Sequence, residues 1–144
     1  MAQGMAGWLI SQKGQFLGTT YTRDGEQKLF IYPRPTTYTG PVAILVDGLS
    51  GSASEVFAAG LRDLGRARVF GSPTEGEALA SMIDRLPNGD VFLYAVGDYV
   101  SAAGQPLEGV GVIPDVVVTP TREALLEGRD EVLQAAVDWI RHQI

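Results

Sequence analysis

The chain has 144 residues and a formal net charge of −6; 45% of its residues are apolar, 19% are charged and none is cysteine. Such a chain is expected to fold as one soluble domain, without disulfides, thiolate catalysis, a cysteine metal site or a bound cofactor. Acidic residues outnumber basic ones and no basic run occurs, so nucleic acid is not expected as a partner; no apolar run approaches the roughly 18 residues of a membrane-spanning helix.

The first 40 residues are expected to contain two elements. A weak one lies around Met5 to Ile10. A β-hairpin is predicted over Tyr21 to Tyr32, because Asp24-Gly25 is a turn signal and the residues after it are rich in aromatic and β-branched side chains. Pro33 and Pro35 end its second strand. The N-terminus lacks the basic and apolar regions of a secretory signal, which leaves the compartment undetermined.

The centre of the chain is predicted to be a βαβ unit. Val42 to Val46 is a short apolar run typical of a buried strand, and Ala53 to Leu64 has apolar residues at helical spacing. Gly65 fits the end of that helix, and Arg66 to Phe70 begins a second strand. The two strands are therefore expected to be parallel, with a right-handed crossover. Gly60 is expected to allow the helix to approach a sheet closely.

The second half alternates Gly- and Pro-rich loops with short elements. Asn88-Gly89 is a strong two-residue turn signal, so residues 79–86 and 91–100 are predicted to form a hairpin. The other expected segments are loops at 71–77 and 104–115, a strand at Val116 to Val118, and helices at Thr121 to Leu126 and Asp130 to Gln143. The whole chain is thus predicted to be an α/β domain with a mostly parallel core sheet, flanking helices and added β-hairpins.

The turn between the first strand and the helix of the βαβ unit is the predicted ligand site, because ligands bind beyond the carboxyl ends of parallel strands. It carries three serines, Ser50, Ser52 and Ser54. A helix N-terminus stabilises an anion, so the turn suits a nucleophile and an oxyanion hole. However, Ser52 and Glu55 also fit a capping box, in which both only satisfy backbone donors. Capping boxes are much commoner than catalytic serines, so these residues alone favour the cap.

The order of several motifs resembles that of the C-terminal processing, or tail-specific, serine peptidases. The matching segments are Ser50–Glu55, Asp63–Ala67, Gly71–Gly76, Leu86–Gly89 and Gly109–Asp115. The resemblance implies a Clp protease/crotonase-like ββα core and acyl-enzyme hydrolysis of extended or C-terminal segments of peptides and proteins. It places Ser52 at the nucleophile position and the N–H of Ala53 in the oxyanion hole. A crotonase-type acyl-CoA enzyme has the same architecture but does not match these motifs.

Two departures from the tail-specific pattern bear on activity. The family's basic lysine follows the serine by 25 residues, and that position is Glu77 here; the only two lysines, Lys13 and Lys28, lie upstream. A loop carboxylate is a weaker base than a desolvated amine. The upstream peptide-binding and cap regions and the first oxyanion turn are also unmatched. Residues 1–144 are therefore expected to be one domain from a larger peptidase, inactive alone, or alternatively a non-catalytic binding or scaffold module.

A second branch of the superfamily, the tricorn proteases, needs no such lysine. It combines the serine with an upstream histidine and a glutamate that Glu108 matches. The resemblance therefore implies a Ser52 and Glu108 pair completed by a histidine outside this chain. His142 is a poor substitute, since a cation near the end of the last helix has an ordinary explanation. The first 40 residues are also expected to leave a sheet edge exposed, which would favour a homo-oligomer.

Overall fold

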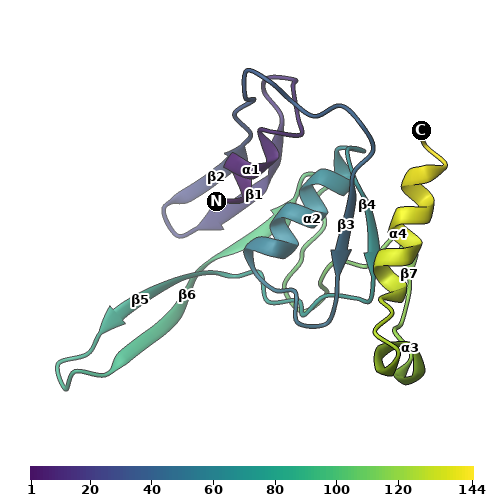
Figure 1. Ribbon diagram of the computed structural model, residues 1–144. Helices are drawn as coiled ribbons and strands as arrows, with labels where there is room; N and C mark the ends of the chain where they lie inside the picture. Colours follow the sequence, from purple (N-terminus) through teal and green to yellow (C-terminus); the bar gives the residue numbers. More distant parts are fainter.

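The computed structural model describes residues 1–144. It contains two β-sheets, and the central helix contacts strands of both (Figure 1). The elements in chain order are α1 (Ala2–Ala6), β1 (Phe16–Thr22), β2 (Gly25–Phe30), β3 (Ala43–Val46), α2 (Ala53–Asp63), β4 (Arg68–Gly71), β5 (Ala80–Arg85), β6 (Val91–Ser101), β7 (Val116–Val117), α3 (Arg122–Leu126) and α4 (Glu131–Arg141). No helix is long and apolar enough to cross a membrane.

The predicted βαβ unit is confirmed. Strands β3 and β4 pair in parallel, from Ala43 opposite Arg68 to Val46 opposite Gly71, with α2 as the connection. Strand β7 adds to the other side of β4, also in parallel. A carboxylate oxygen of Asp115 accepts the N–H of Val69 at 2.8 Å, which ties the start of β7 to β4. The carboxyl ends of all three strands therefore meet at one edge of a small parallel sheet.

Both predicted hairpins are present, and they pair with each other in a way that the local patterns did not indicate. The antiparallel sheet has the strand order β2-β1-β6-β5, with Gly18 of β1 opposite Ser101 of β6. Gly18 is needed at this junction, since a Cβ there would lie 2.2 Å from the hydroxyl of Tyr99. That buried hydroxyl donates to the carbonyl of Leu17 at 2.8 Å. Burial, aided by the nearby carboxylate of Asp63, raises the pKa of Tyr99, which keeps the hydroxyl a donor.

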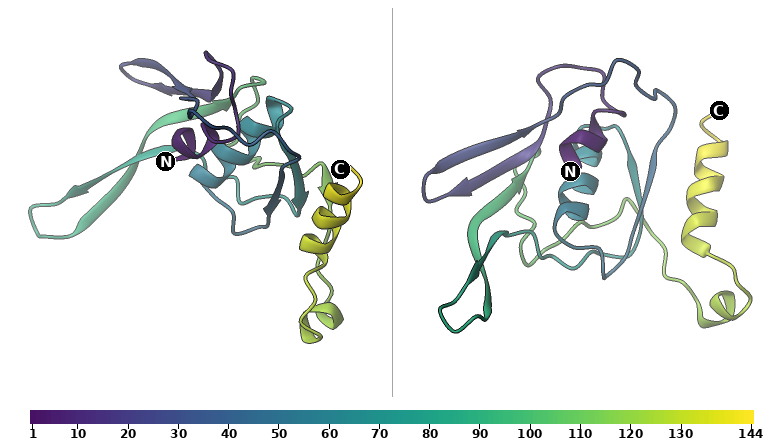
Figure 2. Two further views of the ribbon diagram at one scale, coloured as in Figure 1. Left: turned by 45° about the horizontal axis from the view of Figure 1, so that its top comes forward. Right: turned by 60° about the vertical axis from the view of Figure 1, so that its left-hand side comes forward.

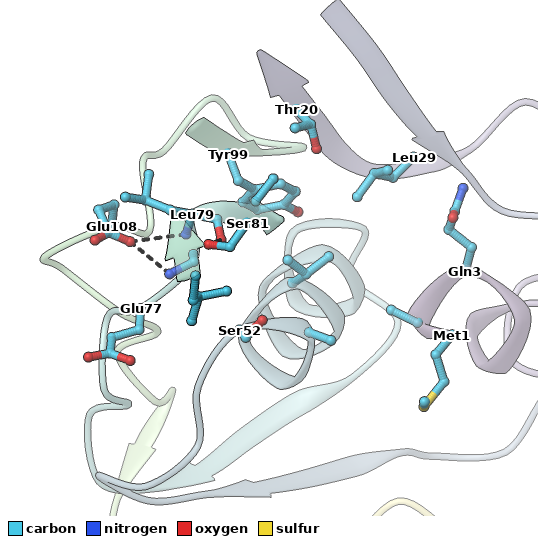
Figure 3. Close-up of a pocket in the computed structure, with 16 residues that line it drawn as sticks. Met1, Gln3, Thr20, Leu29, Ser52, Glu77, Leu79, Ser81, Tyr99 and Glu108 are labelled. Carbon is cyan, nitrogen blue, oxygen red and sulfur yellow. Dashed lines mark hydrogen bonds between the residues drawn. The ribbon is translucent and has the colours of Figure 1, made fainter. Parts of the chain in front are cut away.

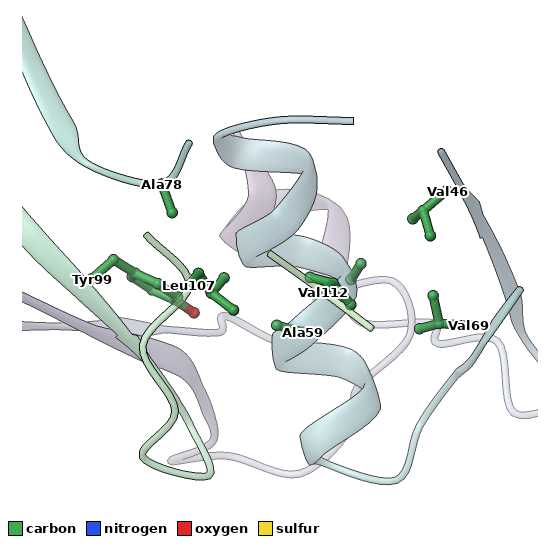
Figure 4. Packing of buried hydrophobic residues seen from close by; sticks show 8 residues of the cluster. Val46, Ala59, Val69, Ala78, Tyr99, Leu107 and Val112 are labelled. Atoms are coloured by element: carbon green, nitrogen blue, oxygen red, sulfur yellow. The ribbon is translucent and has the colours of Figure 1, made fainter. Parts of the chain in front are cut away.

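Helix α2 separates two clusters of buried side chains. On one side it packs with the parallel sheet and the loops after it (Figure 4): Val46, Ala58, Ala59, Val69, Ala78, Tyr99, Leu107 and Val112. On the other it packs with the N-terminal segments: Ala6, Ile10, Leu17, Ile31 and Leu61. The expected close approach at Gly60 is confirmed, because a Cβ there would lie 2.6 Å from Leu17 of β1.

The two ends of the chain differ from each other in how well they were predicted. The N-terminal helix covers Ala2–Ala6 rather than Met5 to Ile10. At Gly7 the chain passes so close to the carbonyl of Tyr32 that a Cβ would lie 2.2 Å from it. At the other end, α3 and α4 lie where the sequence placed them, and α4 packs against β3 and β4 (Figure 2). The β5–β6 hairpin projects from the rest of the molecule in all views.

Candidate active site

A cleft of about 660 Å³ opens at the N-terminus of α2 (Figure 3). Its wall is mostly apolar and comes from α1, the antiparallel sheet, α2 and the loop before β5. The lining includes all four residues that the motifs singled out: Ser52, Ala53, Glu77 and Glu108. Residues up to 56 positions apart in sequence are thus brought to one surface.

Ser52 has a backbone conformation found at no other non-glycine residue of this chain. Its φ is 56° and its ψ is −121°, and its side chain is exposed at the cleft. A side chain held in such a conformation costs on the order of 1–3 kcal/mol and persists only where the surroundings enforce it. Strained serines on a sharp turn from a strand into a helix are typical of nucleophile elbows. The sequence located this turn but did not predict the strain.

The N–H of Ala53 has no acceptor among the protein atoms. The neighbouring donors of the first helical turn are paired: Ser54 donates to Gly51, and the N–H groups of Glu55 and Val56 both donate to the carbonyl of Ser52. Since the free N–H directly follows the serine at the positive end of α2, it can stabilise an anion formed at the serine.

The strain at Ser52 predicts an unusual order of stabilities. Ser52→Gly should be more stable than Ser52→Ala by about 1 kcal/mol, because glycine adopts positive φ freely whereas alanine keeps the clash of its Cβ. Urea unfolding followed by circular dichroism measures the difference. Ser54, inside the first turn of α2, is the matched control. There the alanine variant should be the more stable, by up to about 1 kcal/mol, and an identical order at both positions would contradict the strain.

The capping-box interpretation holds for Glu55 but not for Ser52. A carboxylate oxygen of Glu55 accepts the N–H of Ser52 at 2.9 Å, as a capping box requires, while the Ser52 side chain makes no cap hydrogen bond. Glu55 is fully buried and also contacts the 74–77 loop. Sequence reasoning missed this second role. The available signal was its spacing from the buried residues Ala58 and Ala59, which puts Glu55 on the inner face of α2.

Glu77 lies beside Ser52, as the 25-residue spacing predicted. Its backbone carbonyl accepts the N–H of Ser52 at 2.9 Å. The Glu77 side chain is exposed, has no hydrogen bond or ion pair, and points away from Ser52 (Figure 3). A carboxylate in water is not activated as a base by desolvation, so this side chain is poorly suited to take the serine's proton.

Glu108 stabilises the cleft wall. One of its carboxylate oxygens accepts the N–H groups of Ala78 and Leu79, at 2.8 and 3.1 Å (Figure 3). These bonds hold the segment that leads into β5. His142 does not line the cleft; its Nδ1 lies 2.6 Å from the carbonyl of Asp138 at the end of α4. The cleft is lined by neither lysine nor histidine.

Comparison with known families identifies the fold and its catalytic class. The sequence profile of peptidase family S41 matches residues 4–118, which is most of the chain. The chain belongs to peptidase family S41. The family and the Clp protease/crotonase-like fold predicted from the motifs are confirmed.

Individual S41 relatives match only in part of their length. The chain is 35% identical over 85 residues to "Probable CtpA-like serine protease" of Staphylococcus epidermidis, covering 58% of this chain and 17% of that protein. The photosystem II D1 C-terminal processing protease superposes with a TM-score of 0.71 and 27% identity, over 83% of this chain and 31% of that one. Tricorn protease gives a TM-score of 0.66 at 21% identity, over 90% of this chain and 13% of that one, and so shares the fold.

Proposed function

We propose that this S41 chain carries the nucleophile of a serine peptidase, and that the nucleophile is Ser52. One observation carries the proposal: Ser52 is the only non-glycine residue with positive φ, and it stands at a helix N-terminus beside the unpaired N–H of Ala53. Both halves of an acyl-transfer site, an exposed hydroxyl and an oxyanion donor, therefore meet at one apolar cleft.

The proposed reaction proceeds through an acyl-enzyme. The Ser52 oxygen bonds to the carbonyl carbon of a peptide while its proton passes to a general base. The oxyanion accepts the N–H of Ala53, a contact typically worth about 2.7 to 4 kcal/mol in the transition state. Collapse of the intermediate breaks the C–N bond and releases the protonated amine. Water then hydrolyses the ester and returns the proton to Ser52.

The general base is proposed to come from outside these 144 residues. Neither lysine nor histidine lines the cleft, and the Glu77 side chain points into solvent. An external histidine beside Glu108 would complete a tricorn-like arrangement, with Glu108 either orienting the histidine or continuing to hold the cleft wall. Glu108 has one carboxylate oxygen free of backbone donors for such a contact.

The proposed substrates are extended segments of peptides or proteins, including their C-termini. Support comes from the apolar lining of the cleft and from β5, an edge strand whose first residues border it. An unpaired edge can accept an extended peptide as an added strand. The outer strand β2 is likewise an edge, which supports the proposal that copies of the protein associate with each other.

A fluorophosphonate probe tests the assignment of Ser52 in the full-length protein. The phosphonyl group should be found on Ser52 by peptide mass spectrometry. Ser52→Ala should abolish the label, whereas the neighbouring Ser54→Ala should keep it. A folded full-length protein without label at Ser52 would refute the assignment.

A non-catalytic peptide-binding module is the second candidate. It is favoured by one observation, the solvent-directed carboxylate at residue 77, whose backbone contacts Ser52. On this hypothesis the full-length protein binds an extended peptide in calorimetry, Leu79→Arg in the cleft weakens that binding, and the probe does not react. Labelling at Ser52 would exclude it.

A further inference from the structure

Glu55 is buried in a way that capping alone does not require. Its side chain has no exposed surface, and no basic residue forms an ion pair with it. A carboxylate at a helix N-terminus can cap the helix while it remains in water. Burying one is unfavourable unless hydrogen bonds replace its hydration. In this chain four donors do so, and they come from two different segments.

The two carboxylate oxygens divide these donors. Oε2 accepts the N–H of Ser52 at 2.9 Å and that of Glu77 at 3.1 Å. Oε1 accepts the hydroxyl of Thr74 at 2.5 Å and the N–H of Gly76 at 2.8 Å. Because the N–H of Ser52 also donates to the carbonyl of Glu77, residues 52, 55 and 77 form a closed group of hydrogen bonds. The Glu55 carboxylate thus joins the serine's backbone to the loop that approaches it.

A third segment is joined through Thr74. Its hydroxyl oxygen accepts the N–H of Val112 at 2.7 Å, so the loop after Glu108 is connected to the same carboxylate. The loops touch closely: a Cβ on Gly111 would lie 2.7 Å from the carbonyl of Thr74, and one on Gly76 would lie 3.1 Å from the N–H of Gly111. With no space for sliding, the position of Glu55 is transmitted to all three loops.

We propose that Glu55 is a positioning residue of the Ser52 site. It holds the backbone of Ser52 in its positive-φ conformation and keeps residue 77 against it, and it exchanges no proton in the reaction. The inference rests on the proposed serine peptidase function. It goes beyond that function by assigning the geometry of the nucleophile to one buried carboxylate.

Glu55→Gln in the full-length protein tests the proposal. The glutamine keeps the size of the side chain but replaces one acceptor oxygen with an NH₂ group, which cannot accept from backbone N–H groups. The maximal rate of fluorophosphonate labelling should fall about 10-fold to 100-fold, with little change in the probe concentration for half-maximal rate, because the nucleophile is displaced while the cleft is kept.

Thr74→Val is the matched control. It removes one donor to the same carboxylate but leaves the Oε2 bonds to Ser52 and Glu77 in place. Its maximal labelling rate should fall less than about 3-fold, even where its melting temperature falls as much as that of Glu55→Gln. Equal losses of maximal rate in the two variants, or none in Glu55→Gln, would overturn the proposal.

Amide hydrogen exchange separates a failure of this proposal from a failure of the proposed function. In Glu55→Gln the Ser52 and Glu77 amides should exchange at least about 10-fold faster, whereas α4 amides should not change. If the wild-type protein is not labelled, the peptidase proposal fails, and the exchange result still decides whether Glu55 positions Ser52. Unchanged exchange at both amides would refute the positioning role.

Discussion

Glu77→Lys in this chain should raise the rate of fluorophosphonate labelling at Ser52 by about 10²-fold at alkaline pH. A general base typically accelerates such a step by about 10² to 10⁴, and the lower figure applies to one that the site does not orient. The backbone of residue 77 already contacts Ser52. A lysine side chain is longer than glutamate and can turn toward the hydroxyl, where its neutral amine can accept the proton.

The pH dependence of this gain has a definite sign. Only the neutral amine is a base, and an exposed lysine has a pKa of about 10.4. The labelling rate should therefore increase about tenfold per pH unit up to that value and level off above it. The original chain, which has a carboxylate at this position, should show no such rise below pH 9, because carboxylates are fully ionised there.

Two variants control for the change of charge. Glu77→Gln removes the negative charge without adding a base, and Glu75→Lys adds the same amine two residues away in the same loop. Neither should gain more than about 3-fold, since neither puts an amine at the residue whose backbone contacts Ser52. If all three variants react alike, the effect is electrostatic and residue 77 is not a base position.

The second large effect is expected at the edge of the parallel sheet. Gly71→Ala should lower the free energy of unfolding by about 3 to 5 kcal/mol. Gly71 has a φ of +126° at the end of β4, and a Cβ there would lie 1.9 Å from the carbonyl oxygen of Val46. Both atoms are backbone or rigidly attached to it, so β3 and β4 must separate to admit the methyl group. Urea unfolding of the chain measures the loss.

Gly128→Ala separates the steric clash from the backbone strain. Gly128 also has positive φ, at +70°, but nothing lies within 4 Å of the position of its Cβ. Its substitution should cost about 1 to 2 kcal/mol, the ordinary penalty for a side chain in the left-handed region. Comparable losses at the two glycines would show that close approach of β3 and β4 does not limit the structure at Gly71.

The predictable parts of the fold are those encoded within a few residues. The turn at Asn88-Gly89, the apolar run before Ser52 and the helical spacing after it each give an element within about two residues of its observed bounds. The pairing of the two hairpins was not predictable in this way. It joins β1 to β6, about 80 residues apart, and depends on Gly18 and Tyr99 meeting at one position.

The site shows the same division. The sequence alone places Ser52 at the start of a helix after a parallel strand, and puts a carboxylate where related peptidases have lysine. It also excludes cysteine chemistry. Each of these depends on residue identity or local spacing.

Only the tertiary structure decided that Ser52 is strained, that Ala53 has a free N–H and that Glu55 is buried. Each depends on the 74–77 loop or on the absence of any nearby acceptor, and hydrogen bonds between segments some 20 residues apart have no periodicity that a sequence displays. A serine that would be an ordinary helix cap is therefore held with its hydroxyl uncommitted, because Glu55 and Glu77 together bind its N–H.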